Sequence, residues 1–121
     1  MKALKILVED VPGGVVCIDL SGSIDARNYE KLEQTFKKKF AEDRYSFIVD
    51  LSRLEAISSA GAGVFLGAAS ICQDHQGAIV LVRPTKTVEE ILDLLGVYQI
   101  FPVAKGREEA LSQLTVSDAA P

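Results

Sequence analysis

Several residue types are scarce in this sequence, and each shortage excludes a class of protein. Only two of the 121 residues are cysteine. Both lie in apolar stretches, so the chain lacks the disulfide framework of a small secreted domain and fits a reducing compartment. Basic residues are too few for an obligate nucleic-acid binder, because the sequence has 13 basic and 17 acidic residues and a net charge of -4. We therefore expect protein partners and no direct contact with nucleic acid.

Long apolar runs are missing as well. No segment approaches the roughly 18 uncharged apolar residues that a membrane span requires. The N-terminal run 4–8 contains Lys5 and ends at Glu9, which makes it too short for the core of a signal peptide. We therefore expect a cytoplasmic protein without membrane insertion. A chain of 121 residues, 48% of them apolar, is sufficient for one domain that folds without disulfides or metal.

The spacing of apolar residues predicts alternating strands and helices. Short apolar runs predict strands at 4–8, 15–20, 47–51 and 78–82 and a short extended piece at 99–101. Repeats at three and four residues predict helices at 26–41, 59–74, 87–95 and 107–114. The segment 52–57 is expected to be a loop. This order predicts an α/β fold, a mixed β-sheet with a largely parallel core covered by four helices.

Capping residues and charges predict further details of these elements. Asp25 is expected to be the N-cap of the first helix, a role that contributes about 1 kcal/mol. Thr87 and Glu90 have the spacing of a capping box at the third helix. The run 37–39 consists of lysines and is expected on a solvent-exposed helix face. We expect a single domain over residues 1–116 and a flexible tail over 117–121, with the chain already loose from residue 115.

A glycine-rich segment opens the second predicted helix. Gly61, Gly63 and Gly67 lie within seven positions, and each is less favourable in a helix than alanine by roughly 0.5–1 kcal/mol. One explanation is close packing of this helix on the sheet or on a neighbouring helix. Another is that the first turn is kept bare so that a second protein can reach its backbone. Both can hold, because they concern different faces of the helix.

Known chemical motifs do not fit this segment. The glycines read G-x-G-x-x-x-G, one residue longer than the dinucleotide fingerprint, and no P-loop sequence is present. The single histidine, His75, follows Ser59 by 16 residues on the same predicted helix, about 24 Å away, which excludes a Ser–His pair within one subunit. Cys72 and His75 offer at most two metal ligands. We therefore expect no catalytic residue, no metal and no cofactor.

Three segments of the sequence carry a likeness to a known family. They are VCIDLSGSID at 16–25, FIVDLS at 47–52 and ISSAGAGV at 57–64. In this order they resemble the STAS domain, and specifically the anti-anti-sigma factors of bacterial partner-switching pathways. LGVYQIF at 95–101 and EEAL at 108–111 also fit that family's C-terminal pattern, so the likeness spans almost the whole chain. It implies a STAS-like mixed sheet.

The resemblance also implies a function and a site. In that family an anti-sigma factor with serine kinase activity binds beside the start of this helix and phosphorylates one serine. The unmodified form captures the kinase and frees the sigma factor, and a protein phosphatase is the expected third partner. The family pattern Asp-Ser-(Ser/Thr)-Gly-x-Gly, registered on Gly61 and Gly63, places the acceptor on Ser59. Here Ser58 replaces the aspartate and Ala60 the second hydroxyl residue, which makes Ser58 a competing acceptor.

The expected partner surface combines the turn after the second strand with the start of the glycine-rich helix. Its residues are Asp25, Ser58, Ser59, Ala60, Gly61, Ala62 and Gly63. A phosphate here adds about -1.5 to -2 charges where a partner must touch, while the helix dipole tolerates them. The sequence thus predicts an anti-sigma factor antagonist switched off by phosphorylation. The alternative is a constitutive STAS scaffold subunit of a lipid-transport or stress-signalling complex, and an enzyme is the third reading.

Overall fold

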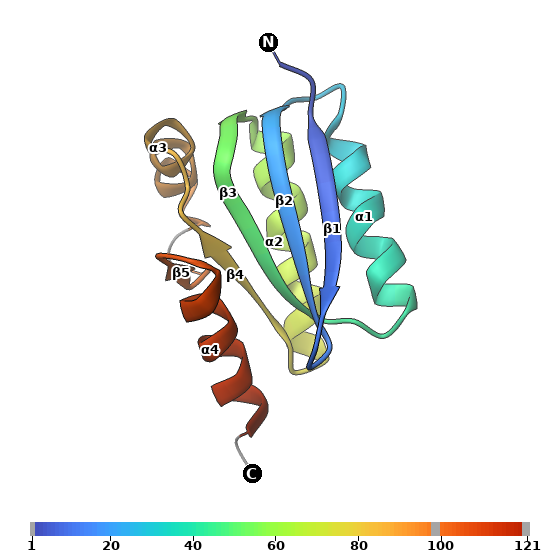
Figure 1. The fold of residues 1–121 in the computed structure, drawn as a ribbon. Helices are drawn as coiled ribbons and strands as arrows, with labels where there is room; N and C mark the ends of the chain where they lie inside the picture. The colour runs from blue at the N-terminus through green and yellow to red at the C-terminus, as the bar shows by residue number, and fades with distance from the viewer. Residues whose placement is uncertain (1, 98–99, 120–121) are drawn as a thin grey trace.

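The computed structural model describes residues 2–97 and 100–119, with side chains described as far as Leu114. A five-stranded sheet in the order β1-β2-β3-β4-β5 and four helices make up the fold (Figure 1). In chain order the elements are β1 (Lys5–Val11), β2 (Val15–Ile24), α1 (Tyr29–Ala41), β3 (Ser46–Ile57), α2 (Ser59–Asp74), β4 (Ala78–Val82), α3 (Lys86–Leu94), β5 (Val103–Ala104) and α4 (Arg107–Ala119).

The sheet is mixed, with a parallel core. β1 pairs antiparallel with β2, and every other neighbouring pair is parallel. The hairpin between β1 and β2 turns at Gly13 and Gly14, whose φ angles of 95° and 81° are readily adopted only by glycine. This confirms the predicted α/β class, the largely parallel core and the four covering helices.

Two apolar cores lie on opposite faces of the sheet. On one face α1 and α2 cover the strands, as Figure 1 shows, and bury Phe36 and Phe65 against β3. On the other face α4 packs Ala110 and Leu114 over Cys17 and Ile48. On this face, α4 covers only the first residues of β2 and β3. The polar residues that follow them in each strand do not belong to the core under α4. The later parts of both strands are therefore available to polar side chains.

The predicted loop at 52–57 is wrong, because β3 continues to Ile57. The cause is pairing with the far end of β2, where Ser23 and Ile24 lie opposite Ala56 and Ile57. Two register shifts interrupt this pairing, so the alternation of apolar and polar residues that would reveal a strand is broken in the sequence. The extension brings the end of β3 beside the end of β2.

Two predicted helix starts are also wrong. α1 begins at Tyr29 with Asn28 as N-cap, because the carboxylate of Asp25 accepts a hydrogen bond from the Arg27 amide, 2.8 Å away, and closes a turn before the helix. The N-cap of α3 is Thr85 and not Thr87, because the Thr85 hydroxyl accepts from the amide of Val88 at 3.3 Å. Both shifts replace a capping residue by another polar residue nearby.

Other local predictions also need correction. The strand near the C-terminus is Val103–Ala104, whereas Phe101 of the predicted extended piece lies in a bend and residue 99 lies outside the described residues. The backbone is helical from residue 115 to residue 119, where a loose tail was expected. Lys39 does not lie on a solvent face, since its side chain is only 12% exposed and its Nζ lies 3.2 Å from a carboxylate oxygen of Asp10. The domain boundary at residue 116 stays a prediction.

Candidate partner-binding site

The start of α2 and the turn after β2 lie side by side. The backbone amide of Ser58, the residue before α2, donates a hydrogen bond to the carbonyl oxygen of Ile24, the last residue of β2, at 2.9 Å. Asp25 is the next residue of the chain after Ile24, so it lies beside the start of α2. The structure therefore brings together the two sequence segments, 25 and 58–63, that were predicted to form one partner surface.

The two serines at this position have different environments. Ser58 is the N-cap of α2, half-buried, and its hydroxyl oxygen accepts a hydrogen bond from the Gly61 amide at 3.2 Å. Ser59 is the first helical residue, is exposed, and its hydroxyl forms no hydrogen bond with any described residue. The cap of this helix is therefore Ser58 and not Ser59. The Ser59 hydroxyl is free for chemistry.

The glycines of α2 divide into a buried one and two exposed ones. A Cβ atom added to Gly61 would lie 2.6 Å from Cγ2 of Ile24 and 2.9 Å from Cγ1 of Ile57, so close packing on both strand ends requires glycine there. Apart from their own neighbours in the helix, added Cβ atoms at Gly63 and Gly67 would meet no atom of the described residues within 4 Å. Packing inside the domain therefore explains Gly61 and leaves Gly63 and Gly67 without an internal reason.

The flanking alanines complete the first turn of α2. Ala60 is half-buried, whereas Ala62 is only 1% exposed and belongs to the core under α1 and α2. Among the helical residues predicted to bind a partner, Ser59 and Gly63 are thus exposed and Gly61 and Ala62 are not. The buried pair fixes the position of the exposed pair. Whether any of them touches a partner stays a prediction.

Asp25 presents a partly exposed carboxylate beside this helix start. Its side chain is 22% exposed, with one oxygen 3.3 Å from the Arg27 guanidinium. The hydrogen bond from the Arg27 amide is the main reason why the pKa of Asp25 lies below its usual range. Arg27, with a side chain 83% exposed, belongs to this surface but was missed, because a lone arginine in a predicted helix gives no signal of its placement.

The remaining candidate groups lie elsewhere. His75 caps the far end of α2 and stacks on Tyr45 with ring centroids 3.9 Å apart, so it is distant from Ser59. Cys17 and Cys72 are buried at 2% and 0% exposure. Within residues 2–97 and 100–119 no group of three or more His, Cys, Asp or Glu side chains is placed to hold a metal ion. None of the helices described is long and apolar enough to cross a membrane.

Comparison with known proteins places the chain in a family. The model of the STAS domain family matches residues 7–110. BtrV of Bordetella bronchiseptica, provisionally named an anti-sigma factor antagonist, is 33% identical over 107 residues, which cover 88% of this chain and 91% of that protein. The anti-sigma F factor antagonist of Paenibacillus polymyxa is 26% identical over 104 residues, with coverages of 85% and 89%.

Solved structures agree on the fold. The anti-sigma factor antagonist SpoIIAA in its unphosphorylated form superposes with a TM-score of 0.81 at 23% identity, covering 97% of this chain and 100% of that one. The phosphorylated form of SpoIIAA, a Bacillus cell fate determinant, gives a TM-score of 0.72 at 23% identity, with coverages of 90% and 98%. The fold is thus that of a STAS domain.

The chain belongs to the STAS domain family, and within it to the anti-sigma factor antagonists. Its relatives are named as regulators and not as enzymes, which agrees with the prediction that the chain has no catalytic activity of its own. The names of both relatives describe antagonists of an anti-sigma factor. The resemblance identified from the three sequence segments is therefore confirmed.

Proposed function

We propose that this chain is an anti-sigma factor antagonist whose partner is both an anti-sigma factor and a serine kinase, and that the pair acts in the cytoplasm. The unphosphorylated chain binds the kinase through the start of α2 and the Asp25 turn, which frees a sigma factor. Phosphorylation of Ser59 ends this interaction, and a protein phosphatase restores it. The observation that carries the proposal is the exposed, unbonded Ser59 hydroxyl at the N-terminus of α2.

The position of Ser59 suits a switch that changes binding without changing the fold. A phosphate at the first helical residue lies at the positive end of the helix dipole, which stabilises the charge by roughly 0.3–1 kcal/mol. The same charge opposes an acidic partner surface. A like-charge contact at about 4 Å and an effective dielectric constant near 20 is unfavourable by about 4 kcal/mol, which corresponds to up to a thousandfold in affinity.

The competing acceptor, Ser58, is less suited to this role. Its hydroxyl oxygen already accepts the hydrogen bond from the Gly61 amide, and its side chain is half-buried. Modifying it would disturb an N-cap that contributes about 1 kcal/mol. We therefore assign the modification to Ser59, although Ser58 replaces the aspartate of the family pattern.

The decisive experiment combines mass spectrometry with binding. Incubation with the candidate kinase and ATP should add about 80 Da to the chain, and Ser59→Ala should abolish the gain whereas Ser58→Ala should not. Ser59→Asp should weaken kinase binding at least about 100-fold by calorimetry. Ser70→Asp is the matched control, because Ser70 is exposed on the same helix, about three turns beyond Ser59, and it should bind like the natural chain.

Two results would contradict the proposal. An unchanged mass with a kinase that is active on another substrate would remove the phosphorylation step. Equal binding by Ser59→Asp and Ser59→Ala would favour the alternative of a constitutive scaffold subunit, in which the serines are never modified. Hydrolase activity of the purified chain that is lost in Ser59→Ala would favour an enzyme.

A further inference from the structure

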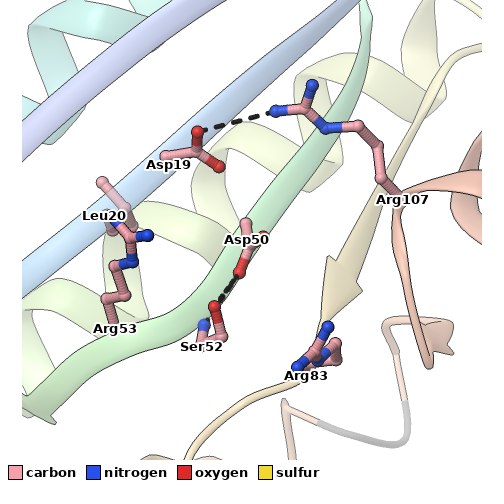
Figure 2. A pocket seen from close by; sticks show the side chains of 7 residues that line it. All are labelled: Asp19, Leu20, Asp50, Ser52, Arg53, Arg83 and Arg107. Atoms are coloured by element: carbon pink, nitrogen blue, oxygen red, sulfur yellow. Dashed lines mark hydrogen bonds and ion pairs between the residues drawn. The ribbon is translucent and has the colours of Figure 1, made fainter.

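A cavity lies on the sheet face opposite α1 and α2. Its volume is about 570 Å³, and charged or polar side chains of β2, β3, α4 and the residue after β4 line it (Figure 2). Those that matter here are Asp19, Asp50, Ser52, Arg53, Arg83 and Arg107. The cavity lies over the middle of β2 and β3, just beyond the residues of both strands that α4 covers.

A β-bulge places Arg53 at this cavity. Leu51 and Leu54 both belong to the core under α1 and α2, a spacing of three where strict alternation allows only two. Between the pairs Asp19–Asp50 and Ser21–Arg53, β3 contains one residue more than β2. The extra residue leaves both Ser52 and Arg53 exposed and lining the cavity, whereas regular alternation would have directed Arg53 into the core.

A second backbone irregularity places Arg83. Leu81 packs under α1 and α2 and Val82 packs under α4, so the next residue of a regular strand would return to the α1 and α2 side. Instead Arg83 has a φ of 49°, in the left-handed region, and it precedes Pro84, which disfavours non-extended backbone. Its side chain lines the cavity (Figure 2). Two irregular positions thus bring two arginines to one space.

The charges in the cavity are only partly compensated. Arg107 is paired with Asp19 at 3.5 Å and with Glu9 at 3.4 Å. One oxygen of Asp50 accepts hydrogen bonds from the amide and the hydroxyl of Ser52, at 2.9 and 2.7 Å. Arg53 and Arg83 have no ion-pair partner among the described residues, and the second oxygen of Asp50 has no hydrogen bond there.

We infer that this cavity binds a small, soluble phosphate ester that also carries hydroxyl groups. Arg53 and Arg83 bind the phosphate oxygens, for which the guanidinium group offers paired donors, and the free oxygen of Asp50 accepts a hydrogen bond from a hydroxyl. The volume of about 570 Å³ lies within the range of small-molecule sites. This inference does not depend on Ser59, because α2 lies on the other face of the sheet.

The test compares three probes on the complete chain by calorimetry and amide NMR. Glycerol 3-phosphate should bind at least about fivefold more tightly than inorganic phosphate, and glycerol should not bind. The amide shifts should centre on residues 50–53 and 83. Equal affinity for the two phosphates would overturn the role of Asp50. A dissociation constant for glycerol 3-phosphate weaker than about 10 mM would overturn the site.

Variants distinguish binding in this cavity from a general attraction of phosphate to positive charge. Arg53→Gln and Arg83→Gly should each weaken glycerol 3-phosphate at least about tenfold, and Arg83→Gly should stay folded because glycine adopts the left-handed backbone freely. Arg44→Gln, in the turn before β3 at the other end of the strand, is the matched control and should bind normally. A similar loss in Arg44→Gln would overturn the site.

Two further measurements test the hydroxyl and the source of the phosphate. Asp50→Asn retains an oxygen for Ser52 but replaces the free acceptor by a donor, so it should lower the ratio of glycerol 3-phosphate to inorganic phosphate affinity. An unchanged ratio would overturn the assignment of Asp50. Phosphatidylglycerol vesicles present a glycerol phosphate head group, as a diester, in a lipid. Vesicle binding that requires Arg53, without binding of soluble glycerol 3-phosphate, would overturn the soluble ligand.

Discussion

The two neighbouring serines at the start of α2 show how one position along the chain separates a structural role from a chemical one. Ser58 has extended backbone, with φ -86° and ψ 169°, and its side chain faces back to the Gly61 amide. Ser59 is the first residue of α2, and its side chain is exposed. The helix cap thus belongs to the Ser58 hydroxyl and the proposed modification to the Ser59 hydroxyl, and single substitutions can measure each one separately.

Removing the hydroxyl of Ser58 should destabilise the domain, and removing that of Ser59 should not. Ser58→Ala loses the N-cap hydrogen bond to the Gly61 amide and should lower the free energy of unfolding by about 1 kcal/mol. Ser59→Ala should change it by less than about 0.5 kcal/mol, as exposed substitutions usually do. Urea denaturation of both variants measures the difference. Equal losses would show that Ser59 also contributes to the cap.

The buried thiol of Cys72 should make stability fall at alkaline pH. Burial raises the pKa of Cys72 to about 12, whereas an unfolded thiol has a pKa near ~8.5. Between these values the unfolded chain has lost this proton and the folded chain has kept it, so the free energy of unfolding decreases as the pH rises. Below the unfolded pKa the contribution is fully present.

The measurement is the slope of unfolding free energy against pH from about 9 to 11. Cys72→Ala should have a shallower decline than the natural chain, because it removes one thiol whose pKa differs between the two states. Cys17 is present in both proteins, and burial raises its pKa as well, so a residual slope is expected. Identical slopes would contradict this account of Cys72.

At the scale of elements, α2 packs closely on the sheet at Gly61 and has no side chains at its exposed glycines, Gly63 and Gly67. Gly61 lies against Ile24 and Ile57, which joins the helix to the ends of β2 and β3. Gly63 and Gly67 line a shallow apolar groove between α1 and α2, together with Phe36, Phe40 and other residues. Alanine substitutions at Gly61 and at Gly63 should therefore change the free energy of unfolding in opposite directions.

Gly61→Ala should lower the free energy of unfolding by about 1–3 kcal/mol, because the added methyl group overlaps two isoleucine side chains. Gly63→Ala should raise it by about 0.5–1 kcal/mol, since alanine favours the helix and the methyl group meets, beyond its own neighbours in the helix, no atom of the residues that the structure describes. Thermal or urea unfolding gives both values. A loss of stability in Gly63→Ala would mean that the exposed side of α2 is packed after all.

At the scale of the whole molecule, a charge on Ser59 should leave the fold unchanged. Ser59→Asp should not lower the free energy of unfolding, and the helix dipole should raise it by roughly 0.3–1 kcal/mol. The changes in amide NMR shifts should be confined to residues 24–28 and 57–63. Ser70→Asp, away from the N-terminus of α2, should lack the gain. Shifts spread across β1, β4 and β5 would show that the modification acts by remodelling the domain.

Much of the fold could be predicted from the sequence, and the errors have identifiable causes. The order of elements followed from apolar periodicity, and the bounds of α2 agreed with the prediction because the two serines, Ser58 and Ser59, mark its start. β3 was cut short because a bulge breaks its alternation. The starts of α1 and α3 shifted because several polar residues compete for each cap, and local sequence does not decide among them.

The candidate site could be predicted in its residues but not in its environment. The family pattern placed Ser59 and Asp25 together, and the hydrogen bond between Ser58 and Ile24 accounts for their proximity. The separate roles of Ser58 and Ser59 depend on backbone angles that no motif specifies. The arginine cavity could not be predicted from the sequence. A bulge and a residue with left-handed backbone place its side chains, and both depart from the regular alternation by which strand faces are predicted.

The burial of Gly61 and Ala62 has a consequence for redirecting the domain to a new protein partner. A library of variants that randomises both positions would consist mostly of misfolded chains, since neither has room for a larger side chain. Ala60 and Gly63, which reach the surface, are where specificity can be rewritten while the scaffold is preserved.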